Sequence, residues 1–280
     1  MHRGLRGCLV AASCLFLVAT FAETAVASPG WLNRCPYSHS SMDDPIVFPR
    51  KPGASHLHDF FGAKDTNADS TIRSMRHGGT TCDPHDTAGY WVPALYQNGH
   101  RVLPRGGSTR EQIYYRDDNL REGTRVVAYP RGMALIAGDS HATSASQNHE
   151  LGHEIYWGCS DNHPEGKFKS PISCSTGIIT LHVGFPNCWD RQHVSMGRFP
   201  SAVVYPEDGA CPHSHPVALP RLIERWEYPV GIQTGHIRLS SGPVFTIHGD
   251  FWNTWRQRSL RRLVHRCLNR DKDCGTFPRD

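Results

Sequence analysis

Two histidines placed two residues apart form the first pattern in the chain that could do chemistry. They lie in Ser55-His56-Leu57-His58-Asp59-Phe60-Phe61-Gly62. If this segment is extended, both imidazoles project from one face, because side chains alternate along a strand. Two imidazoles on one face form half of a transition-metal site, which Asp59 can complete as a ligand or by orienting a ring. The alternative is that one histidine bonds a turn and the other is solvated.

The same spacing occurs again in Cys211-Pro212-His213-Ser214-His215-Pro216, and a third candidate is His248-Gly249-Asp250-Phe251. Histidine is the commonest metal ligand in proteins, and the chain has 18. We expect one divalent metal ion to be held by histidines from these three clusters, namely His56, His58, His213, His215 and His248. Asp250 is expected near the start of a C-terminal helix, where it could instead serve only as a cap.

Paired carboxyl groups offer a second kind of chemistry. Glycoside hydrolysis usually needs two of them, one with a raised pKa. We assign Asp59 and Asp250 as the acid–base pair, with His58 and His215 as further catalytic residues. Aromatic rings can stack on sugars, although most aromatics of a β-rich domain belong to its core. The substrate-binding residues that we predict are Trp91, Tyr115, Trp189, Asp190 and Trp255.

These clusters follow a segment that predicts export. Residues 1–27 carry Arg3 and Arg6, an apolar stretch and the small-residue cleavage site Ala25-Val26-Ala27 of a signal peptide. The 253 residues that remain of the 280 have 28 basic and 25 acidic side chains. This balance is too even to indicate nucleic-acid binding, and no other apolar run approaches the roughly 18 residues of a membrane span. We expect a secreted, extracellular monomer with one domain, residues 28–280.

Ten cysteines are present, and eight of them follow residue 27. An even number in an exported protein indicates disulfides. Sequence proximity favours three pairs and leaves a fourth, although eight cysteines allow 105 pairings. The pairs are Cys159–Cys174, Cys188–Cys211, Cys267–Cys274 and Cys35–Cys82. Zinc binding is the alternative, but the chain has no CxxC pair.

The elements that must position these residues are short, because 26 glycines and 20 prolines are scattered along the chain. The β-rich runs between them are residues 90–96, 112–115, 126–129, 177–183, 202–205, 237–239 and 244–247. Helical periodicity appears only between residues 252 and 267. We predict a mainly β fold, sandwich-like or irregular, with a C-terminal α-helix and disulfide staples. The arginines of that helix could contact an anionic polymer or form a solvated face.

The order of these clusters resembles the family catalogued as domain of unknown function 1996, which occurs in secreted fungal and actinobacterial proteins. The residues that carry the resemblance are Asp44-Pro45-Ile46-Val47, His56 to Gly62, Tyr90 to Leu95, Ala137-Gly138-Asp139, Phe185 to Asp190, Cys211 to Pro216 and His248 to Phe251 with Trp255. The family name assigns no activity. Some fungal members carry cell-wall or carbohydrate-binding modules, so the resemblance implies a wall or polysaccharide setting.

Three functions follow from these observations. The first is a secreted carbohydrate-active enzyme, a hydrolase or lyase, that acts on extracellular or cell-wall polysaccharide through the histidine and aspartate clusters. The second is a non-catalytic polysaccharide-binding or cell-surface domain, in which aromatic residues and arginines make the contacts. The third is a metal-dependent secreted phosphodiesterase. Neither a GxSxG nucleophile elbow nor a GxxxxGK[ST] phosphate loop is present.

Overall fold

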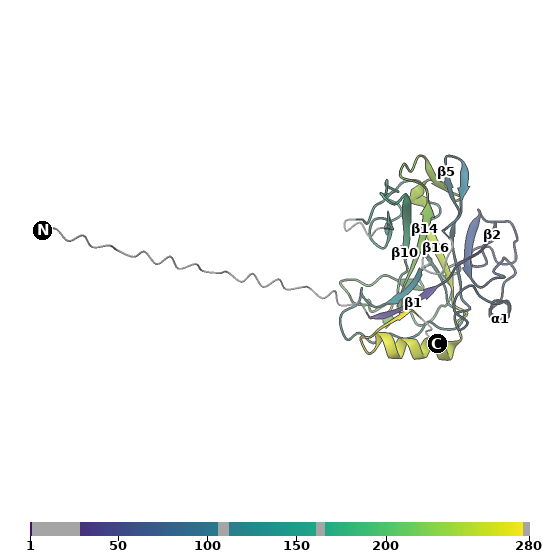
Figure 1. The fold of residues 1–280 in the computed structure, drawn as a ribbon. Helices are drawn as coiled ribbons and strands as arrows, with labels where there is room; N and C mark the ends of the chain where they lie inside the picture. The colour runs from purple at the N-terminus through teal and green to yellow at the C-terminus, as the bar shows by residue number, and fades with distance from the viewer. Residues whose placement is uncertain (2–28, 106–111, 161–165, 277–280) are drawn as a thin grey trace.

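The computed structural model describes residue 1 and residues 29–105, 112–160 and 166–276 (Figure 1). The expected signal peptide, residues 1–27, falls outside the described residues except for Met1. Within the described ranges, no helix has the length and apolar character needed to cross a bilayer.

Two β-sheets contain most of the strands among the described residues. The larger sheet has the strand order β17-β1-β7-β14-β10-β9, and all its neighbours are antiparallel except β1 and β17. Its strands are β1 (Gly30–Arg34), β7 (Gln112–Arg116), β9 (Ile155–Cys159), β10 (Ile178–Gly184), β14 (Arg221–Pro229) and β17 (Asp273–Thr276). The second sheet is antiparallel and has the order β2-β3-β4-β16-β8. Its strands are β2 (Tyr37–Ser41), β3 (His58–Gly62), β4 (Gly89–Pro93), β8 (Ala134–Gly138) and β16 (His248–Trp252).

The main core joins the two sheets. Phe61 of β3 stacks on Trp226 of β14, with ring centroids 3.6 Å apart. The hydroxyl groups of Tyr90 and Tyr115 lie 2.6 Å apart and link the sheets by a hydrogen bond. The inner face of the second sheet therefore packs against the larger sheet through aromatic side chains. Its outer face carries a smaller apolar cluster that includes Phe60 and Trp91.

The remaining elements are small. Two three-stranded sheets consist of β11 (Cys188–Trp189), β12 (Val203–Val204) and β13 (Val217–Ala218), and of β5 (Leu95–Gln97), β6 (His100–Val102) and β15 (Ile237–Leu239). The helices are α1 (Ile72–His77), the 3₁₀ turn η1 (Val244–Thr246) and α2 (Gln257–Leu263), which continues as the π-helix η2 (Val264–Leu268). The predictions of a mainly β fold and a C-terminal helix are confirmed.

Three local predictions were wrong. Residues 126–129 are not a strand, because the side-chain amide of Asn269 bonds both the N–H and the carbonyl of Val126. Residues 244–247 form a 3₁₀ turn and its exit, because the Thr246 N–H and hydroxyl both donate to the Pro243 carbonyl. The C-terminal helix begins only at Gln257, so Asp250 lies within β16 and does not cap the helix.

The three cysteine pairs favoured by sequence proximity and the remaining pair, Cys35–Cys82, are all disulfides in the described part of the chain, the other three being Cys159–Cys174, Cys188–Cys211 and Cys267–Cys274. The last pair joins the C-terminal helix to β17. Each cross-link restricts the unfolded chain and contributes about 2–4 kcal/mol to stability.

Candidate metal centre

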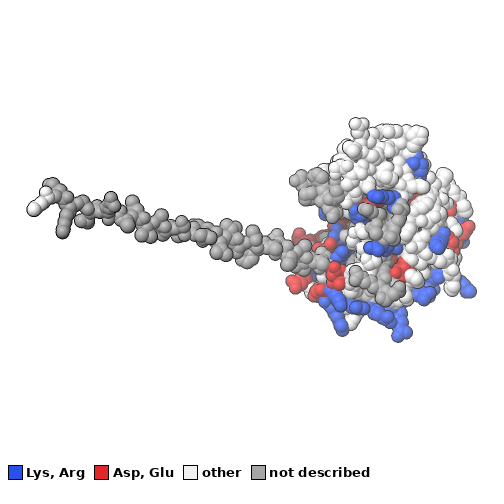
Figure 2. All heavy atoms as spheres, in the orientation of Figure 1, with Lys and Arg blue, Asp and Glu red and all other residues white. Residues whose placement is uncertain are grey.

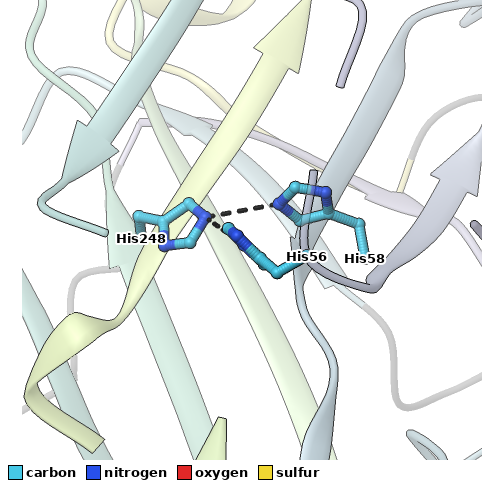
Figure 3. A group of neighbouring side chains, drawn as sticks. All are labelled: His56, His58 and His248. Atoms are coloured by element: carbon cyan, nitrogen blue, oxygen red, sulfur yellow. Dashed lines mark hydrogen bonds between the residues drawn. The ribbon is translucent and has the colours of Figure 1, made fainter. Parts of the chain in front are cut away.

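The candidate site lies on the outer face of the second sheet. The register places His58 beside Pro93, Trp91 beside Asp250, and His248 beside Gly138. Because directly paired residues point to the same side, His58, His248 and Asp250 share this face. His56 precedes β3, and its ring centroid lies 4.2 Å from that of His58. Figure 3 shows the three imidazoles converging from β16 and from the start of β3.

Backbone carbonyls fix the proton positions on two of the rings. Nδ1 of His58 donates to the Asp43 carbonyl at 3.0 Å, and Nδ1 of His248 donates to the Thr246 carbonyl at 2.9 Å. A carbonyl oxygen can only accept, so each Nδ1 carries the hydrogen and each Nε2 presents a lone pair. These two Nε2 atoms lie 3.3 Å apart. Two lone pairs at this separation repel unless a cation lies between them.

The nitrogen spacing matches that of a tetrahedral metal site. The Nε2 atoms of His56 and His248 are 3.2 Å apart, and those of His58 and His248 are 3.3 Å apart. Nitrogens bound to zinc at about 2.0–2.1 Å and separated by a tetrahedral angle lie about 3.3–3.4 Å from each other. Two of the three nitrogen–nitrogen separations therefore match those of zinc ligands, and all three ligand nitrogens lie within 4.8 Å of one another.

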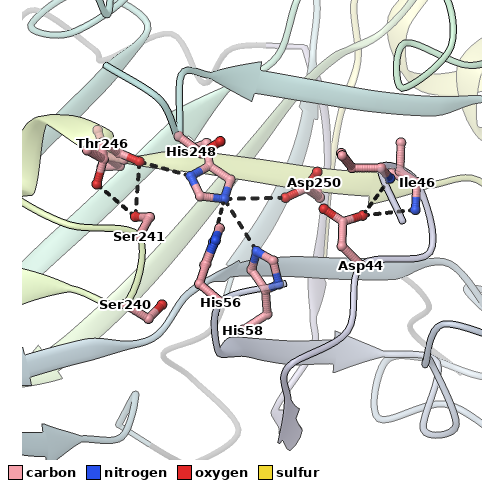
Figure 4. Close-up of polar contacts among 12 residues, drawn as sticks. Asp44, Ile46, His56, His58, Ser240, Ser241, Thr246, His248 and Asp250 are labelled. Carbon is pink, nitrogen blue, oxygen red and sulfur yellow. Dashed lines mark hydrogen bonds and ion pairs between the residues drawn. The ribbon is translucent and has the colours of Figure 1, made fainter. Parts of the chain in front are cut away.

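Two aspartates lie beside the histidines (Figure 4). Oδ2 of Asp250 is 4.0 Å from Nε2 of His248 and accepts no hydrogen bond from the described residues. Asp44, Asp250 and His58 each present a ligand atom within 4.8 Å of the others. One oxygen of Asp44 accepts the N–H groups of Ile46 and Val47, both at 2.9 Å. These contacts hold the Asp44 carboxyl beside the cluster.

Burial controls the charge of these groups. Desolvation lowers the pKa of His56 to about 4 and that of His248 to about 3, and nearby His141 adds to both effects. Burial also lowers the pKa of His58 well below its usual value. Burial raises the pKa of Asp250 well above its usual value, and the like charges of Asp44 and Glu224 raise it further. The site thus holds neutral imidazoles, the form of histidine that binds metals.

The segment that joins β2 to β3 is tied down around Asp43. Its carboxyl group accepts the Gly53 N–H and the Ser41 hydroxyl, both at 2.9 Å. The Ser55 N–H donates to the Met42 carbonyl at 3.0 Å, which closes the segment at its base. Asp43 therefore folds this loop and also directs its own carbonyl to His58.

A cavity of about 340 Å³ opens from the cluster. Its lining includes His56, His248, Asp250, Asp44 and the exposed ring of His141. A second hollow of about 470 Å³ adjoins it and also borders Val47, with Trp252 in its lining. Asp250 and Trp252 lie two residues apart on one face of β16, about 6.6–6.8 Å along the strand. The two hollows share Val47 in their linings, and we call them together the groove, which has the histidines in one hollow and the indole of Trp252 in the other.

The second histidine pair lies elsewhere. His213 is exposed, and His215 donates from Nε2 to the Ser201 carbonyl at 2.5 Å. Its Nδ1 lies 2.9 Å from the Ser214 hydroxyl, so both ring nitrogens have local partners. The structure brings together His56, His58 and His248 but not His213 or His215.

Asp59 faces away from the cluster, because it alternates with His58 along β3. It is fully buried and forms an ion pair with Arg101 and a 2.6 Å hydrogen bond with Ser40. These partners leave Asp250 and Asp44 as the carboxyl groups of the cluster.

The five predicted substrate-binding residues are dispersed. Trp91, Tyr115 and Trp255 are fully buried, and Tyr115 and Trp255 belong to the main core. Trp91 packs in the small cluster beneath the candidate site. Trp189 and Asp190 are half-buried near the small sheet of β11, where Asp190 pairs with His193 at 2.5 Å. Trp252 is the tryptophan that borders the groove.

Two sequence signals were missed. Asp44 stands in an Asp-Asp-Pro sequence that is typical of a turn. Its burial, which the sequence does not show, identifies it as a possible ligand. Residues 149–153 read His-Glu-Leu-Gly-His, the HExxH pattern of zinc proteases. That pattern needs a helix to bring both histidines to one face, whereas here it forms turns with both histidines exposed. It therefore adds no ligand to the cluster.

A family model for a domain of unknown function, DUF1996, matches residues 44–255. The match spans most of the chain, and the protein belongs to this family. All five residues of the candidate centre, Asp44, His56, His58, His248 and Asp250, fall within the matched span. No curated protein and no solved structure matches the chain.

Proposed function

We propose that the protein is a secreted, metal-dependent enzyme that hydrolyses an extracellular polysaccharide. In this proposal residues 1–27 are removed on export, and residues 28–280 form one domain. One observation carries the proposal: the Nε2 lone pairs of His58 and His248 face each other at 3.3 Å in a buried site, which calls for a cation between them.

The metal we propose is zinc or a similar divalent ion, held by His56, His58 and His248. Catalytic zinc sites have three protein ligands and one position open to water or substrate. Here the open position would face the cavity of about 340 Å³. A bound divalent ion supplies a water of lowered pKa and polarises the bond to be broken.

Asp250 is our candidate for the proton acceptor in the reaction. Its Oδ2 lies 4.0 Å from Nε2 of His248 and accepts no hydrogen bond from described residues, so it can accept one from a water at the centre. Asp44, held by the Ile46 and Val47 N–H groups, is placed to support it as a second carboxyl.

The groove supports a polymeric substrate. Its two hollows, about 340 and 470 Å³, have the size of ligand sites and share Val47 in their linings. The indole of Trp252 is fixed at its far end by a 3.2 Å hydrogen bond to the Gly132 carbonyl. A fixed, partly exposed indole provides a stacking surface for a sugar ring next to the bond that is cleaved.

The test is release of soluble sugar from wall polysaccharides by the zinc-loaded protein. We expect cleavage by the unaltered chain and by a His215→Ala variant, and loss of at least about 100-fold in rate for His58→Ala and Asp250→Asn. Products with a new C=C bond would assign a lyase. Retention on the polysaccharide without release would support the non-catalytic binding domain instead. Full activity in both His58→Ala and Asp250→Asn would show that the site is wrong.

A further inference from the structure

The outer face of the C-terminal helix carries a dense set of positive charges. Residues 256–270 contain six arginines and no acidic residue. All six are exposed, and within the described part of the chain none forms an ion pair. We call this set the arginine face: Arg256, Arg258, Arg261, Arg262, Arg266 and Arg270. Figure 2 shows Lys and Arg gathered along the edge of the molecule where Figure 1 places this helix.

The rest of the helix fixes these charges in place. Its inner side buries Leu260, Leu263, Val264 and Cys267 in the main core. The disulfide Cys267–Cys274 ties its end to β17. An amphipathic helix that enters a bilayer must expose its apolar side, and this one cannot. The helix that carries the arginine face is therefore anchored to the core, and its exposed side is cationic.

The arrangement is unfavourable for the isolated protein. Arg258, Arg262 and Arg266 follow one another at four-residue steps, and like charges at this spacing destabilise a helix. Arg256 and Arg258 also lie at the positive end of the helix dipole, and the first turn has no acidic residue. An anionic partner outside the chain would relieve both effects.

A hollow of about 370 Å³ adjoins the end of the helix. Arg125, His265 and Arg270 line it together with Asp271. The cationic surface therefore extends beyond the helix onto the segment near Arg125. Such a surface can hold several anionic groups of one chain at once.

We propose that the arginine face docks the protein on an anionic polysaccharide. Arg258 and Arg262 lie about 6 Å apart along the axis of α2, and Arg266 continues the row into η2, an arrangement suited to a polymer with regularly repeated anions. Residues 256–270 include no Phe, Tyr or Trp on which bases could stack. The choice of a polysaccharide over another polyanion rests on the proposed function. The surface itself is separate from the histidine centre.

The test compares two triple variants by their binding to alginate, a polymer of uronic acids. The first is Arg258→Gln/Arg262→Gln/Arg266→Gln. The control, Lys51→Gln/Lys64→Gln/Arg73→Gln, removes three exposed charges elsewhere. We expect the unaltered protein to bind with an affinity that falls as NaCl rises from 50 to 200 mM. The first variant should lose at least about tenfold in affinity at 50 mM, and the control less than twofold.

Equal losses in the two variants, or no binding of alginate by the unaltered protein, would overturn the proposal. Tighter binding to duplex DNA than to alginate at equal charge concentration would also overturn it in favour of a nucleic-acid surface. Circular dichroism and zinc content should be the same in all three proteins. A change in zinc content would concern the histidine centre, so failure of either proposal can be recognised separately.

Discussion

The two His-x-His pairs have the same spacing and opposite environments. His56 and His58 join a cluster with His248, where carbonyl partners on Nδ1 of His58 and of His248 leave their Nε2 lone pairs facing each other. His213 and His215 lie in a turn, where Nε2 of His215 is occupied by the Ser201 carbonyl. The difference teaches that spacing alone does not make a ligand pair. The backbone must be extended, and the hydrogen bonds must free the same nitrogen on each ring.

The largest effect should come from removing a ring of the first pair. We expect His58→Ala to weaken zinc binding by more than about 100-fold, since loss of even an outer-shell partner costs about 10–100-fold. Titration calorimetry with zinc would measure this. His56→Ala, which removes a less buried ring, gives a second measurement if His58→Ala folds poorly. The double variant His213→Ala/His215→Ala is the matched control and should bind zinc like the unaltered chain.

Removal of the metal should change the thermal stability of the protein only when the first His-x-His pair is intact. Zinc at 100 times its dissociation constant adds about 2.7 kcal/mol to the folded state, which corresponds to a rise in Tm of roughly 5–10 °C for a chain of this size. A chelator should therefore lower the Tm of the unaltered protein and of His215→Ala by this amount. It should leave the Tm of His58→Ala unchanged. An equal drop in all three would place the metal outside the cluster.

A smaller loss of zinc affinity is expected when the loop that orients the ring of His58 is altered. Asp43→Ala removes the carboxyl group that holds Gly53 and Ser41, so the Asp43 carbonyl is no longer held toward His58. Zinc affinity should fall by about 10–100-fold while the three histidines remain. Calorimetry on this variant would contradict our account of the ring orientation if the affinity did not change.

The smallest effect concerns the second pair. His215→Ala deletes the hydrogen bond to Ser201 and should lower the free energy of unfolding by about 0.5–1.5 kcal/mol, as measured by urea denaturation. Its zinc stoichiometry should stay the same. A change in zinc content with no change in stability would reverse the roles that we give to the two pairs.

Part of the fold and of the candidate site could be predicted from the sequence. Alternation along an extended segment correctly predicted that His56 and His58 lie side by side. Three disulfide pairs followed from proximity and the fourth was the pair that remained, and His248 was named because it follows an apolar run. The strand that carries His248 could not be predicted, since His-Gly-Asp-Phe-Trp includes residues disfavoured in strands. Pairing with β4 on one side and β8 on the other fixes it.

Gly138 illustrates a requirement that only the fold reveals. It pairs with His248 at a φ of +88°, and a Cβ atom there would lie 2.4 Å from the Ile247 carbonyl oxygen. Only glycine allows β8 to approach β16 this closely beside the candidate metal centre. Nothing in Ala137-Gly138-Asp139 as a sequence shows that its partner is a histidine more than a hundred residues later.

The position of β16 determines when the centre can form. His248 is separated from His56 by 192 residues and from His58 by 190, and its strand lies between two strands made much earlier in the chain. Contacts of such long range form slowly, because the loop between them must be closed first. A nascent or partly folded chain holds at most two of the three rings together. Tight metal uptake would therefore be one of the last events of folding and would mark a chain whose second sheet is complete.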